Sequence, residues 1–316
     1  MKKITKILSL VLAFSFLASC SDDEDVVIET NTIVDVAVKN NLTSLVAAVT
    51  RADLGATLSS NGSFTVLAPT NQAFETFLQS KGFASVNDVP VDVLRNILLN
   101  HVITGNLRST DLSTGYAKTN ATSAASGTEM SIYINTSNGV VFNGDSTVDI
   151  ANVEADNGIV HVVNKVIDLP TIVTFATADP NFSILVQALT RENDFTYVNT
   201  LSTPNGTSPA PFTVFAPTND AFVDLLGELQ VNGLGDISKA TLSSTLNTHV
   251  VAGANVLESN LSDNLPVNTL GGQLTVNITS NGATLTDSQN RVSTIIATDV
   301  QADNGVIHAI NKVVLE

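Results

Sequence analysis

The pattern of apolar and polar residues occurs twice along the chain. Leucines and valines recur at helical spacing in Asn41–Arg51, and they do so again in Asn181–Arg191. A six-residue run follows in each copy, FTVLAP at Phe64–Pro69 and FTVFAP at Phe212–Pro217, and such short apolar runs are typical of buried strands. Both copies therefore predict an amphipathic helix followed by a strand.

Each predicted strand leads into a second amphipathic helix. Thr70 and Asn71, like Thr218 and Asn219, are residue types that cap helix N-termini. Apolar residues then form a helical stripe that predicts a core-facing side, and they are Ala73, Phe74, Phe77 and Leu78 in the first copy and Ala221, Phe222, Leu225 and Leu226 in the second. A third helix is expected at Val91–Asn100 and Lys239–Asn247, and alternating strands such as MSIYIN and LTVNIT fill the rest.

The repeat predicts two tandem domains of α+β class, residues 31–169 and 170–316. Near the end of each copy, ADNGIVHVVNKV matches ADNGVIHAINKV. The spacing between matching residues grows from 140 at Arg51 and Arg191 to 148 at Phe74 and Phe222, so the second copy gains eight residues, among prolines and glycines typical of a loop. The join IDLPTIVTFATADP is short and apolar, so we expect the domains to contact each other.

Two repeated segments, FTVFAPTNDAF and NGVIHAINKV, resemble the signatures of the fasciclin-like domain, an extracellular module known from adhesion proteins. Both copies contain both segments. The resemblance implies a compact α+β fold in each domain, a wedge-like β-sandwich with helices packed around one edge. The middle segment of the family normally reads Tyr-His. His101 and His249 match its histidine, but Asn100 and Thr248 replace the tyrosine, so an adhesive role of that tyrosine does not carry over.

Animal members of this family also carry an Asp-Ile pair implicated in integrin recognition. Asp236-Ile237 matches this pair, and Asp88-Val89 matches it in part, which makes these four residues candidates for adhesion. A structural interpretation is favoured, because each aspartate precedes a predicted helix and is expected to cap it.

The repeated histidines indicate a requirement of the fold. His161 and His308 each lie in a run of Ile and Val that predicts a central strand, so we expect buried rings whose nitrogens are hydrogen-bonded. His101 and His249 are likewise assigned to the structural motif. The Asn-Gly pairs at Asn157 and Asn304 are expected to form the turns that lead into these strands, because Gly and Asn tolerate positive φ.

The N-terminus predicts a lipoprotein. Lys2 and Lys3 precede an apolar run of signal-peptide length, and the run ends in LASC, which resembles the bacterial lipobox. Residues 1–19 are then a signal peptide, and Cys20 carries the lipid that attaches the chain to a membrane. Residues 20–30 form an acidic tether that resembles the surface-export signal of Bacteroidetes lipoproteins, and its acidic residues are Asp22, Asp23, Glu24 and Asp25.

Charge and motif content narrow the function. The chain has 30 acidic and 14 basic residues, a net charge of −16, and its only cysteine is the predicted lipid site. Such a chain is a poor partner for nucleic acid, which is bound through Lys and Arg. The sequence contains no HExxH or G-x-S-x-G motif, no P-loop and no Rossmann fingerprint, and it suggests no metal or cofactor.

These observations predict a non-enzymatic lipoprotein of the outer membrane that faces the cell exterior. Its role would be adhesion, or interaction with the envelope or extracellular matrix, through an extracellular protein or glycan. One alternative is an accessory glycan-binding protein of a polysaccharide-uptake system, although the absence of Trp and the presence of only three Tyr disfavour an aromatic sugar platform. Another alternative is an envelope hydrolase.

Overall fold

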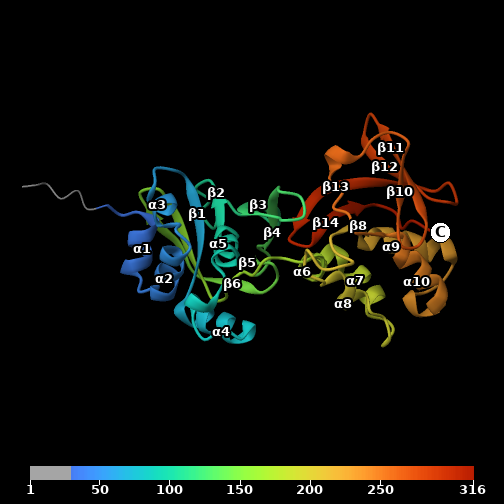
Figure 1. Cartoon of the computed structure of the whole chain (residues 1–316). Coiled ribbons are helices and arrows are strands. Elements are labelled where there is room, and N and C mark those ends of the chain that lie inside the picture. Colours follow the sequence, from blue (N-terminus) through green and yellow to red (C-terminus); the bar gives the residue numbers. More distant parts are fainter. Residues whose placement is uncertain (1–29) are drawn as a thin grey trace, which may run out of the picture. The chain divides into compact units, whose positions relative to one another are not determined.

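The computed structural model describes residues 30–316. The predicted lipid site Cys20 and the acidic residues Asp22, Asp23, Glu24 and Asp25 lie outside the described residues. Residues 31–316 form one compact unit that contains both copies of the repeat (Figure 1).

The first domain alternates helices and strands before it ends in a run of strands. Its helices are α1 Ile33–Lys39, α2 Thr43–Arg51, α3 Gly55–Ser59, α4 Asn71–Lys81, the 3-10 helix Val86–Asp88 and α5 Val91–Leu99. Its strands are β1 Phe64–Pro69, β2 Val102–Thr104, β3 Gly115–Thr122, β4 Glu129–Asn135, β5 Val141–Phe142, β6 Ser146–Ala155 and β7 Gly158–Val163.

The second domain repeats this order. Its helices are α6 Ile172–Ala178, α7 Ser183–Leu189, α8 Tyr197–Leu201, α9 Asn219–Leu229, α10 Lys239–Thr248 and the 3-10 helices Pro180–Phe182, Leu234–Asp236 and Glu258–Asn260. Its strands are β8 Phe212–Pro217, β9 Val250–Ala252, β10 Leu265–Asn268, β11 Gln273–Thr279, β12 Gly282–Thr286, β13 Val292–Ala302 and β14 Gly305–Ile310.

Each domain contains a seven-stranded mixed sheet. The order is β2-β1-β7-β6-β5-β4-β3 in the first domain, and the second domain has the equivalent order β10-β11-β12-β13-β14-β8-β9. In each domain the first strand pairs in parallel with the last strand. These pairs are β1 with β7, where Leu67 lies opposite His161, and β8 with β14, where Phe215 lies opposite His308. The other strand pairs are antiparallel. The predicted α+β class is confirmed.

The central strands are buried on both faces. In β1, Val66 and Ala68 join the core beneath the helices, whereas Leu67 joins a second core on the opposite face with Ile132 and Phe142. The second domain shows the same alternation. Because strands with two covered faces need apolar residues throughout, this arrangement explains why FTVLAP and FTVFAP lack polar alternation.

The predicted N-cap threonines and the apolar stripes of α4 and α9 are present in the structure. Thr70 and Thr218 are the N-caps of α4 and α9, and their hydroxyls accept the N–H groups of Ala73 and Ala221. Asn219 has a different role from the expected cap, because its side chain accepts the N–H of Ile184 and so fixes the start of α7 against α9. The first helix of each domain, α1 and α6, was not predicted from the pattern.

The two domains contact each other, as the apolar join predicts. The backbone N–H of Gln301 in β13 donates to the hydroxyl of Ser131 in β4 at 3.0 Å. Lys118 Nζ donates to the carbonyl of Asp299 at 2.7 Å. Tyr133, although it belongs to the first domain, packs in the hydrophobic core of the second.

Candidate functional site

The strand histidines are satisfied core residues. His161 and His308 are fully buried. His308 Nε2 lies 2.8 Å from the carbonyl oxygen of Val256, and its Nδ1 accepts the N–H of Asp299 at 3.4 Å. His161 makes the equivalent contacts, with Leu107 at 2.9 Å and with the N–H of Asn152. Each ring joins a central strand to a loop and to an irregular part of the neighbouring strand.

The other two histidines join a helix to the end of their own domain. His101 Nδ1 lies 2.8 Å from the carbonyl oxygen of Ile97, and its Nε2 accepts the N–H of Ile167 at 2.8 Å. His249 repeats this arrangement with Thr245 and Val314. Burial lowers the pKa of both histidines to about 4, although each ring's hydrogen bond to a helix carbonyl opposes the shift.

The repeated asparagine has a role that the sequence pattern did not reveal. Asn304 is fully buried, and its side-chain oxygen accepts the N–H of Ile172 at the start of α6. Its amide donates to the carbonyls of Leu201 at 2.8 Å and Thr203 at 2.9 Å, beside the end of α8. Asn157 forms the corresponding three bonds in the first domain. The buried asparagine thus connects a strand turn to two helices.

The expected turns are present at Asn157 and Asn304, but neither asparagine has positive φ, and of the two glycines only Gly305 does, at 156°. The glycine after each is required for close approach instead. A Cβ at Gly158 would lie 2.2 Å from the carbonyl oxygen of Phe64, and one at Gly305 would lie 2.2 Å from that of Phe212. Only a residue without a side chain allows the parallel strands to start side by side.

The Asp-Ile pairs lie in 3-10 turns before α5 and α10. The prediction that each aspartate caps the next helix is wrong, because Pro90 and Ser238 occupy those N-cap positions. The carboxylate of Asp88 instead accepts the N–H and the hydroxyl of Ser85. The apolar partners Val89 and Ile237 are buried.

In each domain an arginine side chain donates a hydrogen bond to the backbone of this turn. Arg191 Nη1 donates to the carbonyl oxygen of Ile237 at 2.8 Å, and Arg51 Nη2 donates to that of Val89 at 3.1 Å. Asp88 and Asp236 remain exposed. A partner could therefore reach the carboxylates of the pairs but not their apolar side chains.

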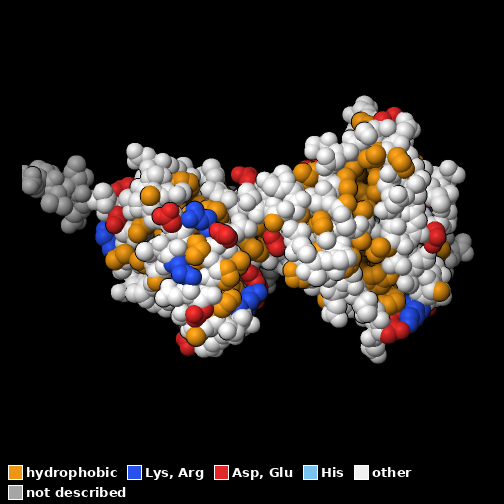
Figure 2. Space-filling view, viewed as in Figure 1, with side chains coloured by type: hydrophobic (Ala, Val, Ile, Leu, Met, Phe, Trp, Pro, Cys, Tyr) orange, Lys and Arg blue, Asp and Glu red, His pale blue; other side chains and the backbone are white. Residues whose placement is uncertain are grey.

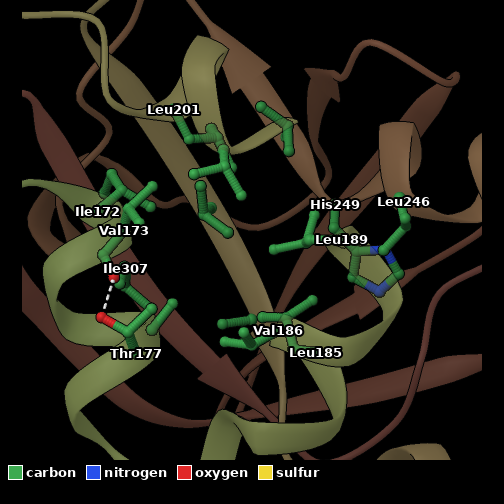
Figure 3. Close-up of a pocket in the computed structure, with 15 residues that line it drawn as sticks. Ile172, Val173, Thr177, Leu185, Val186, Leu189, Leu201, Leu246, His249 and Ile307 are labelled. Carbon is green, nitrogen blue, oxygen red and sulfur yellow. Dashed lines mark hydrogen bonds between the residues drawn. The ribbon is translucent and has the colours of Figure 1, made fainter. Parts of the chain in front are cut away.

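A small apolar cavity lies between helices α6 and α7 and the sheet of the second domain (Figure 3). Its volume is about 30 Å³, and its walls include Ile172, Val186 and Leu201, with the ring of His249 at one side. The first domain has a counterpart of about 20 Å³ near Val46. Ligand pockets are roughly ten times larger, so we assign both cavities to imperfect packing of the repeated fold.

A much larger cleft, of about 530 Å³, lies between the two domains. The first domain contributes Thr114, Tyr116 and Tyr133 to its wall. The second domain contributes further residues from the end of α6, the start of α9 and the strands β13 and β14, and these are Asp179, Asn181, Phe182, Thr218, Asn219, Asp220, Ile296, Ala297, Val300 and Ala309. We call this hollow the interdomain cleft.

Two of the three tyrosines of the chain meet at the interdomain cleft. The ring centroids of Tyr116 and Tyr133 are 5.0 Å apart, and Tyr116 also packs edge-on against Phe175 at 5.5 Å. The hydroxyl of Tyr116 donates to Asp179 Oδ2 at 3.1 Å. Burial, and then the adjacent carboxylate, raise the pKa of Tyr116, so this hydroxyl keeps its proton.

No group of three or more His, Cys, Asp or Glu side chains among residues 30–316 is placed to hold a metal ion. Over the same residues no single helix is long and apolar enough to cross a membrane, although α6 and Pro180–Leu189, bent by 97°, satisfy length and composition together.

The fasciclin domain pattern matches residues 40–170 and 180–316. The pig transforming growth factor-beta-induced protein ig-h3 is 29% identical over 256 residues, which are 80% of this chain but only 35% of that protein. The uncharacterized protein sll1735 of Synechocystis is 35% identical over 151 residues, 46% of this chain and 98% of the relative.

One solved structure shares the fold of the whole pair. It is a FAS1 domain pair from the insect cell adhesion molecule Fasciclin I, with a TM-score of 0.50 and 19% identity. The match covers 90% of this chain and 96% of that structure.

Proposed function

The chain belongs to the fasciclin domain family, and from this premise we propose that it is a non-enzymatic binding protein of the cell surface. Its role is adhesion, or interaction with the envelope or extracellular matrix. The observation that carries the proposal is the family match across both domains, 40–170 and 180–316, shared with a domain pair from a cell adhesion molecule.

The use of the polar residues supports binding over catalysis. The four histidines, the only ones in the chain, have both ring nitrogens engaged with backbone groups. A general base needs a free nitrogen within reach of a substrate proton. Turnover of generic ester or glycoside substrates by the purified chain would contradict the proposal and favour a hydrolase.

The N-terminal sequence supports attachment to the outer membrane. Acyl chains on Cys20 would hold the protein at the membrane, and residues 22–25 would direct it to the cell exterior. The net charge of −16 argues against nucleic acid as a partner. On the face drawn in Figure 2, Lys and Arg are few and scattered over the domains.

Adhesion of living cells tests the proposal. A strain that lacks the protein should adhere less to surfaces coated with matrix proteins or with cells of its own kind, and the wild-type chain should restore adhesion. Cys20→Ala should lose palmitate labelling and fail to restore it. Equal adhesion with and without the chain on every surface would contradict the proposed role.

The export signal is tested separately. Replacement of Asp22, Asp23, Glu24 and Asp25 by Ala should protect the chain from protease added to intact cells, while its amount in the membrane fraction stays constant. The control is the wild-type chain, which has the same tether length and keeps its acidic residues. Unchanged digestion of the variant would leave these residues as a plain tether.

A further inference from the structure

The interdomain cleft has an unbalanced charge. Among the residues that line it, Asp179 and Asp220 are acidic and none is Lys or Arg. Asp220 is exposed in the first turn of α9. Neither carboxylate takes part in any ion pair formed among residues 30–316.

Asp179 is the more unusual of the two, because its side chain is 95% buried without a cation beside it. It accepts the Tyr116 hydroxyl at Oδ2 and the N–H of Asn181 at Oδ1 at 3.0 Å. Each carboxylate oxygen has a further acceptor position. The residue also follows the last turn of α6, where the dipole of the peptide groups favours a positive charge. The hydroxyl of Tyr133 is hydrogen-bonded to this carboxylate as well. Asp179 therefore has polar partners, and what it lacks is the cation that ordinarily accompanies a buried charge.

The walls of the cleft suit a long side chain that ends in a cation. Ile296 is 53% exposed at the rim, and Phe182 and Val300 continue the apolar surface inward. Such a surface packs against methylene groups, as the stems of Arg and Lys require.

We propose that the interdomain cleft binds a basic side chain, above all an arginine, of a partner protein, with its cationic head at Asp179 and Asp220. Arginine fits best, because its planar fork can contact a carboxylate through two N–H groups. The inference rests on the proposed function, since it names the chemistry of the surface to which the chain would adhere.

A neutral sugar is the competing occupant, because Asn and Asp side chains also bind hydroxyls. The cleft offers little open aromatic face for it: Tyr133 is 2% exposed, and Tyr116 is packed against Phe175 and Tyr133. An anion is disfavoured by the two carboxylates. The charge of the ligand therefore distinguishes the candidates, and a cation is favoured over a neutral sugar or an anion.

The test compares two peptides that differ only in charge. Acetyl-Gly-Arg-Gly-amide and its citrulline counterpart, which is neutral and nearly the same shape, are titrated into the purified whole chain by calorimetry. The arginine peptide should bind at least about tenfold more tightly, because hydrogen bonds to charged groups are stronger than neutral ones. Added salt should weaken it. Equal affinity for both peptides, or no heat with either, would overturn the proposal.

Variants locate the binding in the cleft. Asp220→Asn should weaken the arginine peptide by a few-fold, as expected for an exposed ion pair, and Asp179→Asn by about tenfold or more. Asp224→Asn is the matched control, since Asp224 is exposed one turn further along α9 and does not line the cleft. Asp220→Asn changes an exposed side chain and should not affect folding. It therefore still tests binding in the cleft if Asp179→Asn fails to fold.

Two results would contradict the assignment of the cleft. Equal binding by wild type and Asp220→Asn, with the loss appearing in Asp224→Asn, would place the site elsewhere. Binding of maltotriose that survives both cleft variants would assign the cleft to neutral sugars. The peptide measurement uses purified protein and is independent of the adhesion experiment on cells. The cleft proposal can therefore fail while the adhesive role holds, and the adhesive role can fail while the peptide binds.

Discussion

The imidazole of His308 is held on both sides by backbone groups, and removing it should destabilise the second domain. His308→Ala leaves the carbonyl of Val256 and the N–H of Asp299 without partners and opens a cavity, at a combined cost of about 2–4 kcal/mol. Thermal unfolding of the whole chain should shift down by roughly 10 °C. His161→Ala should act similarly.

The control for these variants is Asn232→Ala, an exposed position whose side chain has no partner in the described structure. It should melt like wild type. If both histidine variants also melt like wild type, the structural explanation of the repeated histidines is contradicted, and a ligand should be sought at those two rings.

The helix-joining histidines predict how stability depends on pH. Their pKa is about 4 in the folded chain and near 6.5 in the unfolded chain, so the unfolded state binds protons first as the pH falls. Stability should be constant above about pH 7, fall between pH 6.5 and pH 4, and lose up to about 3 kcal/mol per histidine. Calorimetric unfolding at pH 7.5 and pH 5 measures this loss, and an unchanged stability would contradict the buried neutral rings.

At the scale of elements, the buried asparagine is expected to matter more than its neighbours in the motif. Asn304→Ala removes three hydrogen bonds that join β14 to α6 and to the chain after α8. Unsatisfied buried groups cost about 1–3 kcal/mol each, so the second domain should lose roughly 3 kcal/mol or more. Chemical denaturation with Asn157→Ala as the counterpart checks this, and a loss no larger than that of Asn232→Ala would contradict it.

The sequence allowed these elements to be predicted, but not the way they meet. Helices and strands follow local periodicity, and the repeat offered each pattern twice, so α4, β1 and their copies were expected correctly. The roles of Asn157 and Asn304 depend on helices more than 95 residues away in the chain. The local pattern predicts the turn at each asparagine, but it does not reveal the hydrogen bonds that the side chain makes to these distant helices.

At the scale of the whole molecule, the contacts between domains should couple their unfolding. Gln301 is fully buried, its N–H donates to Ser131, and its amide donates to Ser123 Oγ at 3.1 Å. Gln301→Ala removes the amide and should destabilise the chain by about 1–3 kcal/mol. It should also broaden or split a single calorimetric transition. A transition that keeps its midpoint and width would show that this contact contributes nothing.

The interdomain cleft could not be foreseen from the sequence for the same physical reason. Tyr116, Tyr133, Asp179 and Asp220 come from four separate parts of two domains. They meet because β4 packs beside β13 and Tyr116 of β3 packs against Phe175 of α6. The scarcity of tyrosines argued against an aromatic site, yet two of the three meet here. Amino-acid composition gives the number of tyrosines, but an aromatic site depends on their positions in the folded chain.

Adhesion of cells that display a charge-reversed cleft connects the fold to its proposed role most directly. Asp220→Lys, at the same surface abundance as wild type, should reduce adhesion to the level of cells without the chain, because a lysine at the mouth of the cleft repels a basic side chain. Asp224→Lys, with the same change of charge one turn away, should adhere like wild type. Full adhesion by Asp220→Lys cells would contradict binding through the cleft.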